Sequence, residues 1–437
     1  MPDNEQKQNS FVFEELKQRP LNRAKLLRRT LITAFMAVVF GLIACVTFLL
    51  LEPIISRKMN QEGPATIVVF PEDPEEMAPE DMLAGSSQES GSSEEGILLE
   101  DGKLEELISE MKLSRENAAQ IYAAMQKFVE ELQKYMVTVT ALSSNVDWFN
   151  NIQESKNQRS GLILEDNGRE LLILTTAQYV RYVERIIVTL PDGTQAEAKL
   201  KGQDHYTNLA VIAVQMSDLT DKTKEQIAYA PLGSSNSSNM LGMPVVAVGS
   251  PLGVSKSIGY GMIAASSSFF SVPDRNYKWL QTDINGSTEA AGVLFNLSGQ
   301  VIGIISTQGQ AKDNGNLISA IGITELRKVL EKLSNGYEIA YLGVNGMTVP
   351  QEASNFLGVP SGCFVRKVEM DSPAMRAGIQ QGDIIISVNG KYTNTFTEYT
   401  SICMQLETGS KVEVKVKRKS QDEYKEMTFQ MEAQEVK

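Results

Sequence analysis

The feature that most restricts the fold of this chain is a succession of short apolar runs that begins near residue 135. The runs are rich in Val, Ile, Leu and Thr, and turn-forming Gly, Pro, Asn or Asp residues separate them, as in YMVTVTAL, ELLILTTA, RIIVTLPDG, NLAVIAVQM, MPVVAVGSPLG and QVIGIIST. Runs of this length and composition are typical of β-strands joined by turns. They predict antiparallel barrels or sandwiches up to about residue 333. A second globular unit begins near Tyr341 and fills the C-terminus.

The composition limits the chemistry available to such a fold. The 437 residues include one His and three Cys, which excludes a centre with two or three His ligands, a four-Cys zinc site and a disulfide framework within one chain. We therefore expect no metal and no cofactor. Cys363 and Cys403 could pair if their Cα atoms come within about 7 Å; buried free thiols are the alternative that we favour.

Charge is concentrated in the first hundred residues. The net charge is −13, and residues 60–100 alone contain eleven acidic side chains and no Lys or Arg. No long basic stripe follows residues 1–29, so nucleic-acid binding is not expected. Residues 52–102 combine this acidity with Pro, Gly and Ser, a composition that buries too little apolar area to offset ordering. We predict an acidic, disordered linker there.

An uncharged segment of 22 residues, 30–51, precedes this linker. As a helix it crosses a hydrocarbon core of roughly 30 Å. It is longer than the apolar region of a cleaved signal peptide, and buried soluble helices rarely avoid charge for so long. Basic residues dominate the end of segment 1–29, so the positive-inside rule keeps that segment cytoplasmic. The sequence predicts a single-pass signal anchor in the cell membrane, with the bulk of the chain extracytoplasmic.

Residues 103–134 predict an amphipathic helix. Apolar side chains recur at alternating spacings of three and four from Leu104 to Tyr135. This heptad pattern fits a short coiled coil, and it also fits a helix packed on the next domain. Ser114 and Ala118 weaken the apolar seam, which favours the packed helix. Ser114 could also cap a second helix.

The block from residue 135 to the C-terminus resembles the HtrA (Deg) family of serine proteases. The resemblance is carried, in the family's order, by LLILTTAQYV, GQDHYTNLAVIAV, PVVAVGSPLG, IGYGMIAA and QTDINGSTEAAGVLFNLSGQVIGI. It implies a trypsin-like double β-barrel over 135–333 followed by a PDZ domain over 338–437. The expected fold is mainly β, with an α+β PDZ domain, preceded by one transmembrane helix and one amphipathic helix.

The three positions that carry the family's catalytic triad hold other residues here. The resemblance places the family's His, Asp and Ser at Gln178, Asn208 and Ala290. A serine protease needs a hydroxyl nucleophile, an imidazole that takes its proton and a carboxylate that orients the imidazole. Gln, Asn and Ala supply none of these groups. Because Ala291 follows Ala290, a shift of one residue changes nothing, and we expect proteolysis to be lost.

A displaced catalytic pair is the alternative. His205 is the only imidazole and lies three residues before Asn208, while Ser287 lies three residues before Ala290. Three residues move a side chain by several ångströms, and catalysis fails when groups are misplaced by about one. We therefore interpret His205 as an exposed loop residue and Ser287 as a turn residue. An active endopeptidase built on these two residues remains the second hypothesis.

The PDZ resemblance carries a binding site. Tyr341, Leu342, Gly343 and Val344 resemble the family's carboxylate-binding loop, whose backbone N–H groups cradle a peptide C-terminus while the peptide adds to the sheet edge. SPAMRAG, from Ser372 to Gly378, predicts a short capped helix. A second helix around 397–406 flanks the groove.

These residues lead to one leading hypothesis. We expect a membrane-anchored HtrA-like pseudoprotease that binds peptide or protein C-termini through its PDZ domain. It would act as a scaffold, sensor or regulator in envelope protein quality control. A homotrimer and co-assembly with an active relative are both compatible with the sequence, and a purely structural protein is a third hypothesis.

Overall fold

The computed structural model describes Met36 and residues 65–71, 115–146, 152–237, 239–308, 316–421 and 423–435. The predicted membrane span apart from Met36, most of the predicted linker and residues 103–114 lie outside these ranges. Within them, no helix combines the length and the apolar character needed to cross a membrane.

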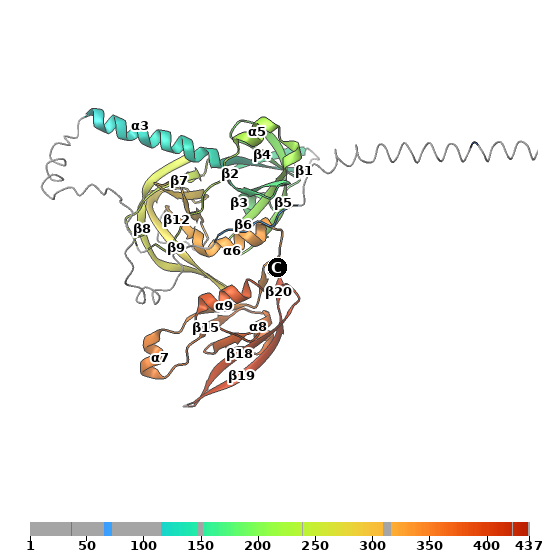
Figure 1. Ribbon diagram of the computed structural model, residues 1–437, viewed down its shortest axis with the longest axis vertical. Helices are drawn as coiled ribbons and strands as arrows, with labels where there is room; N and C mark the ends of the chain where they lie inside the picture. Colours follow the sequence, from blue (N-terminus) through green and yellow to red (C-terminus); the bar gives the residue numbers. More distant parts are fainter. Residues whose placement is uncertain are drawn as a thin grey trace, which may run out of the picture. The chain divides into compact units, whose positions relative to one another are not determined.

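Six antiparallel strands close a first barrel in the order β1-β2-β3-β6-β5-β4 (Figure 1). The strands are β1 (Met136–Val146), β2 (Ile152–Asp166), β3 (Glu170–Thr176), β4 (Arg185–Thr189), β5 (Gln195–Asp204) and β6 (Leu209–Gln215). The apolar runs ELLILTT and LAVIAVQ form β3 and β6, which pair along their whole lengths. Side chains such as Val139, Ile173 and Ile212 fill the interior, because alternate residues of a strand face the same side.

A second closed barrel has the order β10-β11-β12-β9-β8-β7. Its strands are β7 (Pro244–Ser250), β8 (Ser257–Val272), β9 (Arg275–Asn285), β10 (Ala291–Asn296), β11 (Val301–Ile305) and β12 (Leu317–Gly322). β8 and β9 form a long hairpin that pairs out to Val272 and Arg275. The two barrels confirm the predicted mainly β class.

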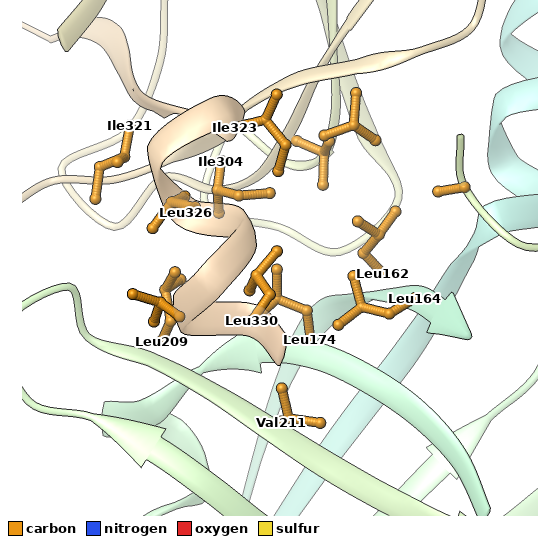
Figure 2. Close-up of a cluster of buried hydrophobic side chains, with 14 of the residues drawn as sticks. Leu162, Leu164, Leu174, Leu209, Val211, Ile304, Ile321, Ile323, Leu326 and Leu330 are labelled. Atoms are coloured by element: carbon orange, nitrogen blue, oxygen red, sulfur yellow. The ribbon is translucent and has the colours of Figure 1, made fainter. Parts of the chain in front are cut away.

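A shared apolar core joins the two barrels to helix α6 (Ile323–Ser334) (Figure 2). Leu162, Leu174 and Val211 contribute from the first barrel, and Ile304 and Ile321 from the second. On α6, side chains spaced three or four residues apart face this core, which is the pattern of an amphipathic helix; they are Ile323, Leu326, Val329, Leu330 and Leu333.

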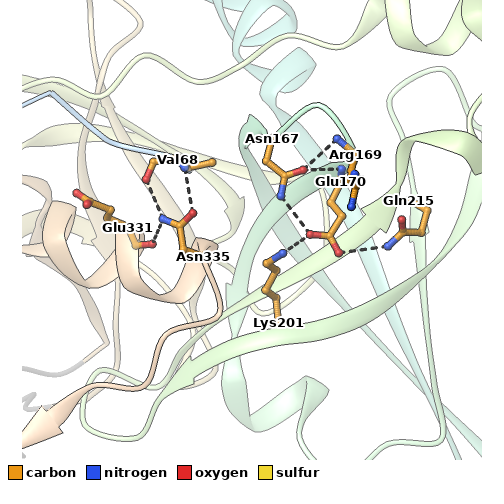
Figure 3. A network of polar contacts seen from close by, with 8 residues as sticks. All are labelled: Val68, Asn167, Arg169, Glu170, Lys201, Gln215, Glu331 and Asn335. Carbon is orange, nitrogen blue, oxygen red and sulfur yellow. Dashed lines mark hydrogen bonds and ion pairs between the residues drawn. The ribbon is translucent and has the colours of Figure 1, made fainter. Parts of the chain in front are cut away.

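The prediction of an acidic, disordered linker over 52–102 is wrong for residues 65–71, which pack on the barrels. Val68 and Phe70 are buried in the shared core. The side chain of Asn335, just after α6, holds this segment: its Nδ2 donates to the Val68 carbonyl at 2.8 Å, and the Val68 N–H donates to its Oδ1 at 3.0 Å (Figure 3). The apolar run TIVVF provides the buried side chains, and the acidic residues around it conceal this run in the overall composition.

Helix α3 (Arg115–Leu132) lies within the predicted amphipathic helix and packs on the shared core. Val129 and Leu132 are buried, and Met125 and Phe128 pack beside them. Ile121, on the predicted heptad seam, is 55 % exposed. The C-terminal part of α3, from Met125 to Leu132, therefore packs on the next domain, whereas the seam position Ile121 does not.

We expect Val129→Ala to lower the free energy of unfolding by about 1–2 kcal/mol, because it removes two buried methyl groups and leaves a cavity. Ile121→Ala is the matched control at an exposed position of the same helix, with an expected change within about 0.5 kcal/mol. Urea unfolding followed by tryptophan fluorescence measures both. Equal losses in the two variants would contradict the packing of α3 on the core.

The C-terminal unit has a separate core and a second sheet. The sheet runs β14-β15-β16-β18-β19, with β17 paired to β16, and a short pair β13-β20 lies apart from it. Its elements are β13 (Ala340–Tyr341), β14 (Val344–Thr348), α7 (Gln351–Leu357), β15 (Cys363–Val368), α8 (Pro373–Ala377), β16 (Ile384–Val388), β17 (Lys391–Tyr392), α9 (Phe396–Cys403), β18 (Lys411–Ser420), β19 (Glu423–Glu432) and β20 (Gln434–Glu435). Ser372 caps α8 and Gly378 ends it in the left-handed region, as the sequence predicts. Strand β14 lies at one edge of the sheet.

Candidate functional site

The structure brings the three predicted triad positions together in one pocket. Gln178 lies on the short helix α4 (Ala177–Val180), Asn208 in the turn between β5 and β6, and Ala290 immediately before β10. Residues of both barrels line this pocket: Thr176, Gln178, Tyr179, Thr207, Asn208, Leu209, Glu289, Ala290, Ala291, Ile305, Ser306 and Thr307. The loops that follow β3, β5 and β11 therefore converge here with the loop that precedes β10.

Gln178 and Asn208 form a mutually hydrogen-bonded amide pair. The Gln178 backbone N–H donates to Asn208 Oδ1 at 3.0 Å, and Asn208 Nδ2 donates to Gln178 Oε1 at 3.3 Å. Asn208 has φ +56°, a left-handed conformation that Asn tolerates better than most residues. Neither amide can take a proton from a nucleophile near neutral pH. The pair holds two loops together and offers no base.

Two backbone N–H groups of the loop around Ala290 donate hydrogen bonds within the loop. The Ala290 N–H donates to the Ser287 carbonyl at 3.0 Å, and the Glu289 N–H donates to Ser287 Oγ at 3.1 Å. In trypsin-like enzymes the N–H of the nucleophile residue points into the oxyanion hole. Here that donor is engaged in a turn, so the loop presents neither a hydroxyl at position 290 nor this oxyanion donor.

His205 and Ser287 are not among the residues that line this pocket. His205 is exposed in the β5–β6 turn, where its ring contacts Tyr206 edge-on. Ser287 accepts the Glu289 N–H and stabilises its own turn. His205 therefore lies in an exposed loop and Ser287 in a turn.

Arg159, on β2, is a site residue that the sequence did not single out. Its Nη2 donates to the Tyr179 hydroxyl at 3.0 Å and forms an ion pair with Glu289, and its guanidinium lies 4.2 Å from the Tyr179 ring centroid. Tyr179 and Glu289 belong to opposite barrels and both line the pocket. Arg159 therefore links the two walls of the pocket. Its two partners lie 20 and 130 residues away in sequence, so no local pattern reveals it.

The predicted peptide-binding loop lies between β13 and β14. The backbone N–H groups of Leu342, Gly343 and Val344 all point at one carboxylate, that of Asp274, at 2.7, 2.9 and 3.0 Å. Gly343 has φ +94°, which only Gly adopts readily. The loop is therefore a formed anion cradle. Asp274, in the turn between β8 and β9, was not identified from the sequence.

The two cysteines of the C-terminal unit are free and buried. Burial raises the pKa of both Cys363 and Cys403, so each is held as the neutral thiol. This matches the favoured alternative of free thiols. Among the residues that the structure describes, no group of three or more His, Cys, Asp or Glu side chains could hold a metal ion.

Comparison with known proteins gives two domain matches. Residues 159–304 match the trypsin-like peptidase domain, and residues 330–428 match the PDZ domain. The "Serine protease Do-like HtrA" of Bacillus subtilis is 30 % identical over 328 residues, covering 69 % of this chain and 70 % of that protein. A "Probable periplasmic serine endoprotease DegP-like" of Halomonas elongata is 31 % identical over 274 residues, and this chain spans 55 % of its length.

A solved structure of the HtrA-type protease AlgW with a decapeptide shares the fold. Its TM-score is 0.50 at 22 % identity, covering 71 % of this chain and 98 % of that one. The order of the domains agrees with the fold. The two barrels come first, as the peptidase match does, and the sheet with the N–H cradle follows, as the PDZ match does. The chain belongs to the HtrA family of serine proteases, with a trypsin-like peptidase domain followed by a PDZ domain.

Proposed function

We propose that this chain is a membrane-anchored, extracytoplasmic HtrA-family pseudoprotease that binds peptide or protein C-termini through its PDZ domain. Its peptidase domain serves as a scaffold. The protein acts as a scaffold, sensor or regulator in envelope protein quality control. The domain limits 135–333 and 338–437 belong to this proposal.

The observation that carries the proposed inactivity is the amide pair beside Ala290. Gln178 and Asn208 are hydrogen-bonded to each other, and the Ala290 N–H is engaged with Ser287. Proton transfer, nucleophile and oxyanion stabilisation each contribute separately to acyl transfer. The three predicted triad positions supply no side chain for the first two, and the turn at Ser287–Ala290 engages one backbone donor needed for the third.

Two observations support the extracytoplasmic, anchored location. The DegP-like relative in Halomonas elongata is named as periplasmic. The uncharged segment 30–51 follows a basic N-terminal stretch, which is the pattern of a signal anchor. Assembly as a homotrimer or with an active relative is part of the same proposal.

Peptide binding is supported by the cradle at Leu342–Val344 and by the edge position of β14, since PDZ ligands pair with such an edge. The related AlgW structure is described with a bound decapeptide. A carboxylate already sits in the cradle of this chain, which shows that its three N–H groups are arranged for one.

The inactivity is tested with the full-length protein in detergent, incubated with a fluorophosphonate probe and with unfolded casein. We expect no labelled serine and no casein fragments, with trypsin as the positive control. Ser287→Ala is the matched variant, and it should behave like the wild-type protein. Labelling or cleavage that the wild type shows and Ser287→Ala lacks would establish the displaced arrangement instead.

A further inference from the structure

The turn between β8 and β9 places an acidic side chain inside the PDZ cradle. Asp274 is 2 % exposed. Its Oδ2 accepts the N–H groups of Leu342 and Gly343, and its Oδ1 accepts the N–H of Val344 and the Tyr399 hydroxyl at 2.6 Å. Four donors thus surround one carboxylate, which is how a terminal carboxylate is held in a backbone nest.

The backbone of the same turn also occupies the sheet edge. The Asp274 N–H donates to the Val344 carbonyl at 2.7 Å, and Asn276 Nδ2 donates to the Gly346 carbonyl at 3.1 Å. Carbonyls two residues apart on a strand point the same way, so both belong to the free edge of β14. A peptide that adds to this edge needs these same two acceptors.

A third contact ties the turn to helix α9, which flanks the groove. Thr400 Oγ1 donates to the Asp274 carbonyl at 2.8 Å, and Tyr399, one residue earlier on α9, is fully buried. The turn therefore meets the loop, the edge strand and the helix, the three walls of a PDZ groove. Asp274 has φ +63°, and in this backbone conformation its side chain points into the cradle.

We infer that Asp274 is a built-in ligand of the PDZ domain, so that a partner's free C-terminal carboxylate must displace it before binding. This inference rests on the proposed peptide binding and deepens it. The occupant that it predicts is a peptide with a free terminal carboxylate, because only a carboxylate replaces the four contacts that the Asp274 side chain makes. Binding then frees the β8–β9 turn of the second barrel from the PDZ domain.

The tether makes Asp274 a strong competitor. A group held on the same chain acts at an effective concentration in the millimolar range. The cradle is therefore closed to weakly binding peptides while Asp274 occupies it. Removing the carboxylate should raise the apparent affinity for C-terminal peptides by at least about tenfold.

Asp274→Asn is the discriminating variant, because Asn tolerates the left-handed backbone of the turn but places an amide where the cradle requires a carboxylate. The matched control is Asp283→Asn on the same hairpin. Asp283 Oδ1 accepts the Met262 N–H at 2.7 Å, a contact that Asn can keep, and it makes no contact with the PDZ loop among those described. Full-length proteins in detergent are titrated into fluorescein-labelled decapeptide pools that end in Val, Leu or Phe, with free or amidated C-termini.

We expect Asp274→Asn to bind the free-carboxylate pools at least about tenfold more tightly than the wild type and Asp283→Asn, and none of the proteins to bind the amidated pools. Equal affinity of Asp274→Asn and the wild type for the free-carboxylate pools would overturn the inference while leaving peptide binding in place. Absence of binding by Asp274→Asn and by Asp274→Gly, which also suits a positive φ, would overturn both.

Hydrogen exchange on the wild-type protein provides a second measurement that needs no variant. Saturation with a free-carboxylate pool should speed exchange in the segment that contains Asp274, whose N–H now bonds to Val344. The segment 342–344 should stay protected, because the peptide replaces the displaced carboxylate. Unchanged exchange at the turn under saturating peptide would contradict displacement.

Discussion

Arg275→Met is expected to lower the free energy of unfolding of the barrel domain by about 3–5 kcal/mol, because it leaves a buried carboxylate without its partner. Arg275 Nη2 and Nη1 bind the two oxygens of Asp204 at 2.9 and 3.2 Å. The two side chains are only 4 % and 2 % exposed. After the substitution Asp204 keeps only Thr207, which donates from its N–H and its hydroxyl.

The double variant Asp204→Asn/Arg275→Met should recover more than half of that loss, since a neutral amide costs less to bury and still accepts from Thr207. Arg185→Met is the matched control, because its pair with Glu197 is more than half exposed on both sides and is worth less than about 1 kcal/mol. Guanidinium unfolding followed by fluorescence measures all three. Both tryptophans, Trp148 and Trp279, precede the PDZ domain in sequence. If Arg275→Met lowered the free energy of unfolding by no more than Arg185→Met does, the buried pair would not stabilise the barrel domain as proposed.

The same pair predicts a pH dependence. Burial raises the pKa of Asp204, but the Arg275 charge and hydrogen bonds outweigh burial and hold this pKa below its usual range. A lowered pKa stabilises the folded state above about pH 4, and the contribution is lost as the pH falls through the lowered value. Without Arg275, burial dominates and Asp204 takes up a proton at higher pH. The gap in stability between wild type and Arg275→Met should therefore be widest near neutral pH and narrow on acidification.

The buried pair also connects the two candidate sites. Asp274 binds the PDZ cradle, and the next residue, Arg275, binds Asp204 at the start of the turn that carries Asn208. Asn208 in turn bonds Gln178. The hairpin tip that contacts the PDZ loop is thus anchored to the loop that carries Asn208. Loss of Arg275 should loosen both ends of this connection.

Much of the fold followed from residue patterns. The β-branched runs of β3, β6, β7 and β11 are apolar almost throughout, which marks buried strands. Strand β5 was missed because its inward residues, Ala196 and Ala198, are small and lie among Lys, Glu and Gln. The Ser-rich second half of β8 lacks a regular apolar pattern, because Val272 is its only buried residue.

Some residues of the candidate sites could be predicted from the sequence and others could not. Gln178, Asn208, Ala290 and the Leu342–Val344 loop sit in motifs that a linear sequence carries. The Arg159–Glu289 and Asp274–Leu342 contacts join residues 130 and 68 positions apart, so only the tertiary fold brings them together. A buried carboxylate in a VPDR turn has no local signature that separates it from an ordinary turn residue.

Gly343→Ala is expected to lower the free energy of unfolding of the PDZ domain by about 2–4 kcal/mol and to abolish binding of both Asp274 and peptide. A β-carbon built at Gly343 lies 2.2 Å from the Cβ of Ser372, and φ is +94°. The backbone conformation costs an alanine about 1–2 kcal/mol. Moving Ser372, which is buried and caps α8 through the Met375 N–H, adds about 0.5–2 kcal/mol.

Gly358→Ala separates the cost of the positive φ from the cost of moving Ser372. Gly358 also has a positive φ, +63°, but nothing lies within 4 Å of a β-carbon built there, so the variant carries only the backbone cost of about 1–2 kcal/mol. Because the PDZ domain has no tryptophan, pulsed hydrogen exchange in urea should be followed in β15, β16 and β18, with β3 and β6 as the barrel reference. If the two glycine variants unfold at the same urea concentration, close packing against Ser372 does not hold the cradle. We expect the PDZ strands of Gly343→Ala to unfold at a lower urea concentration than those of Gly358→Ala, while β3 and β6 keep the wild-type midpoint. The cradle would then depend on Gly343 for space as well as for backbone freedom, and the barrels would remain folded when the PDZ domain unfolds.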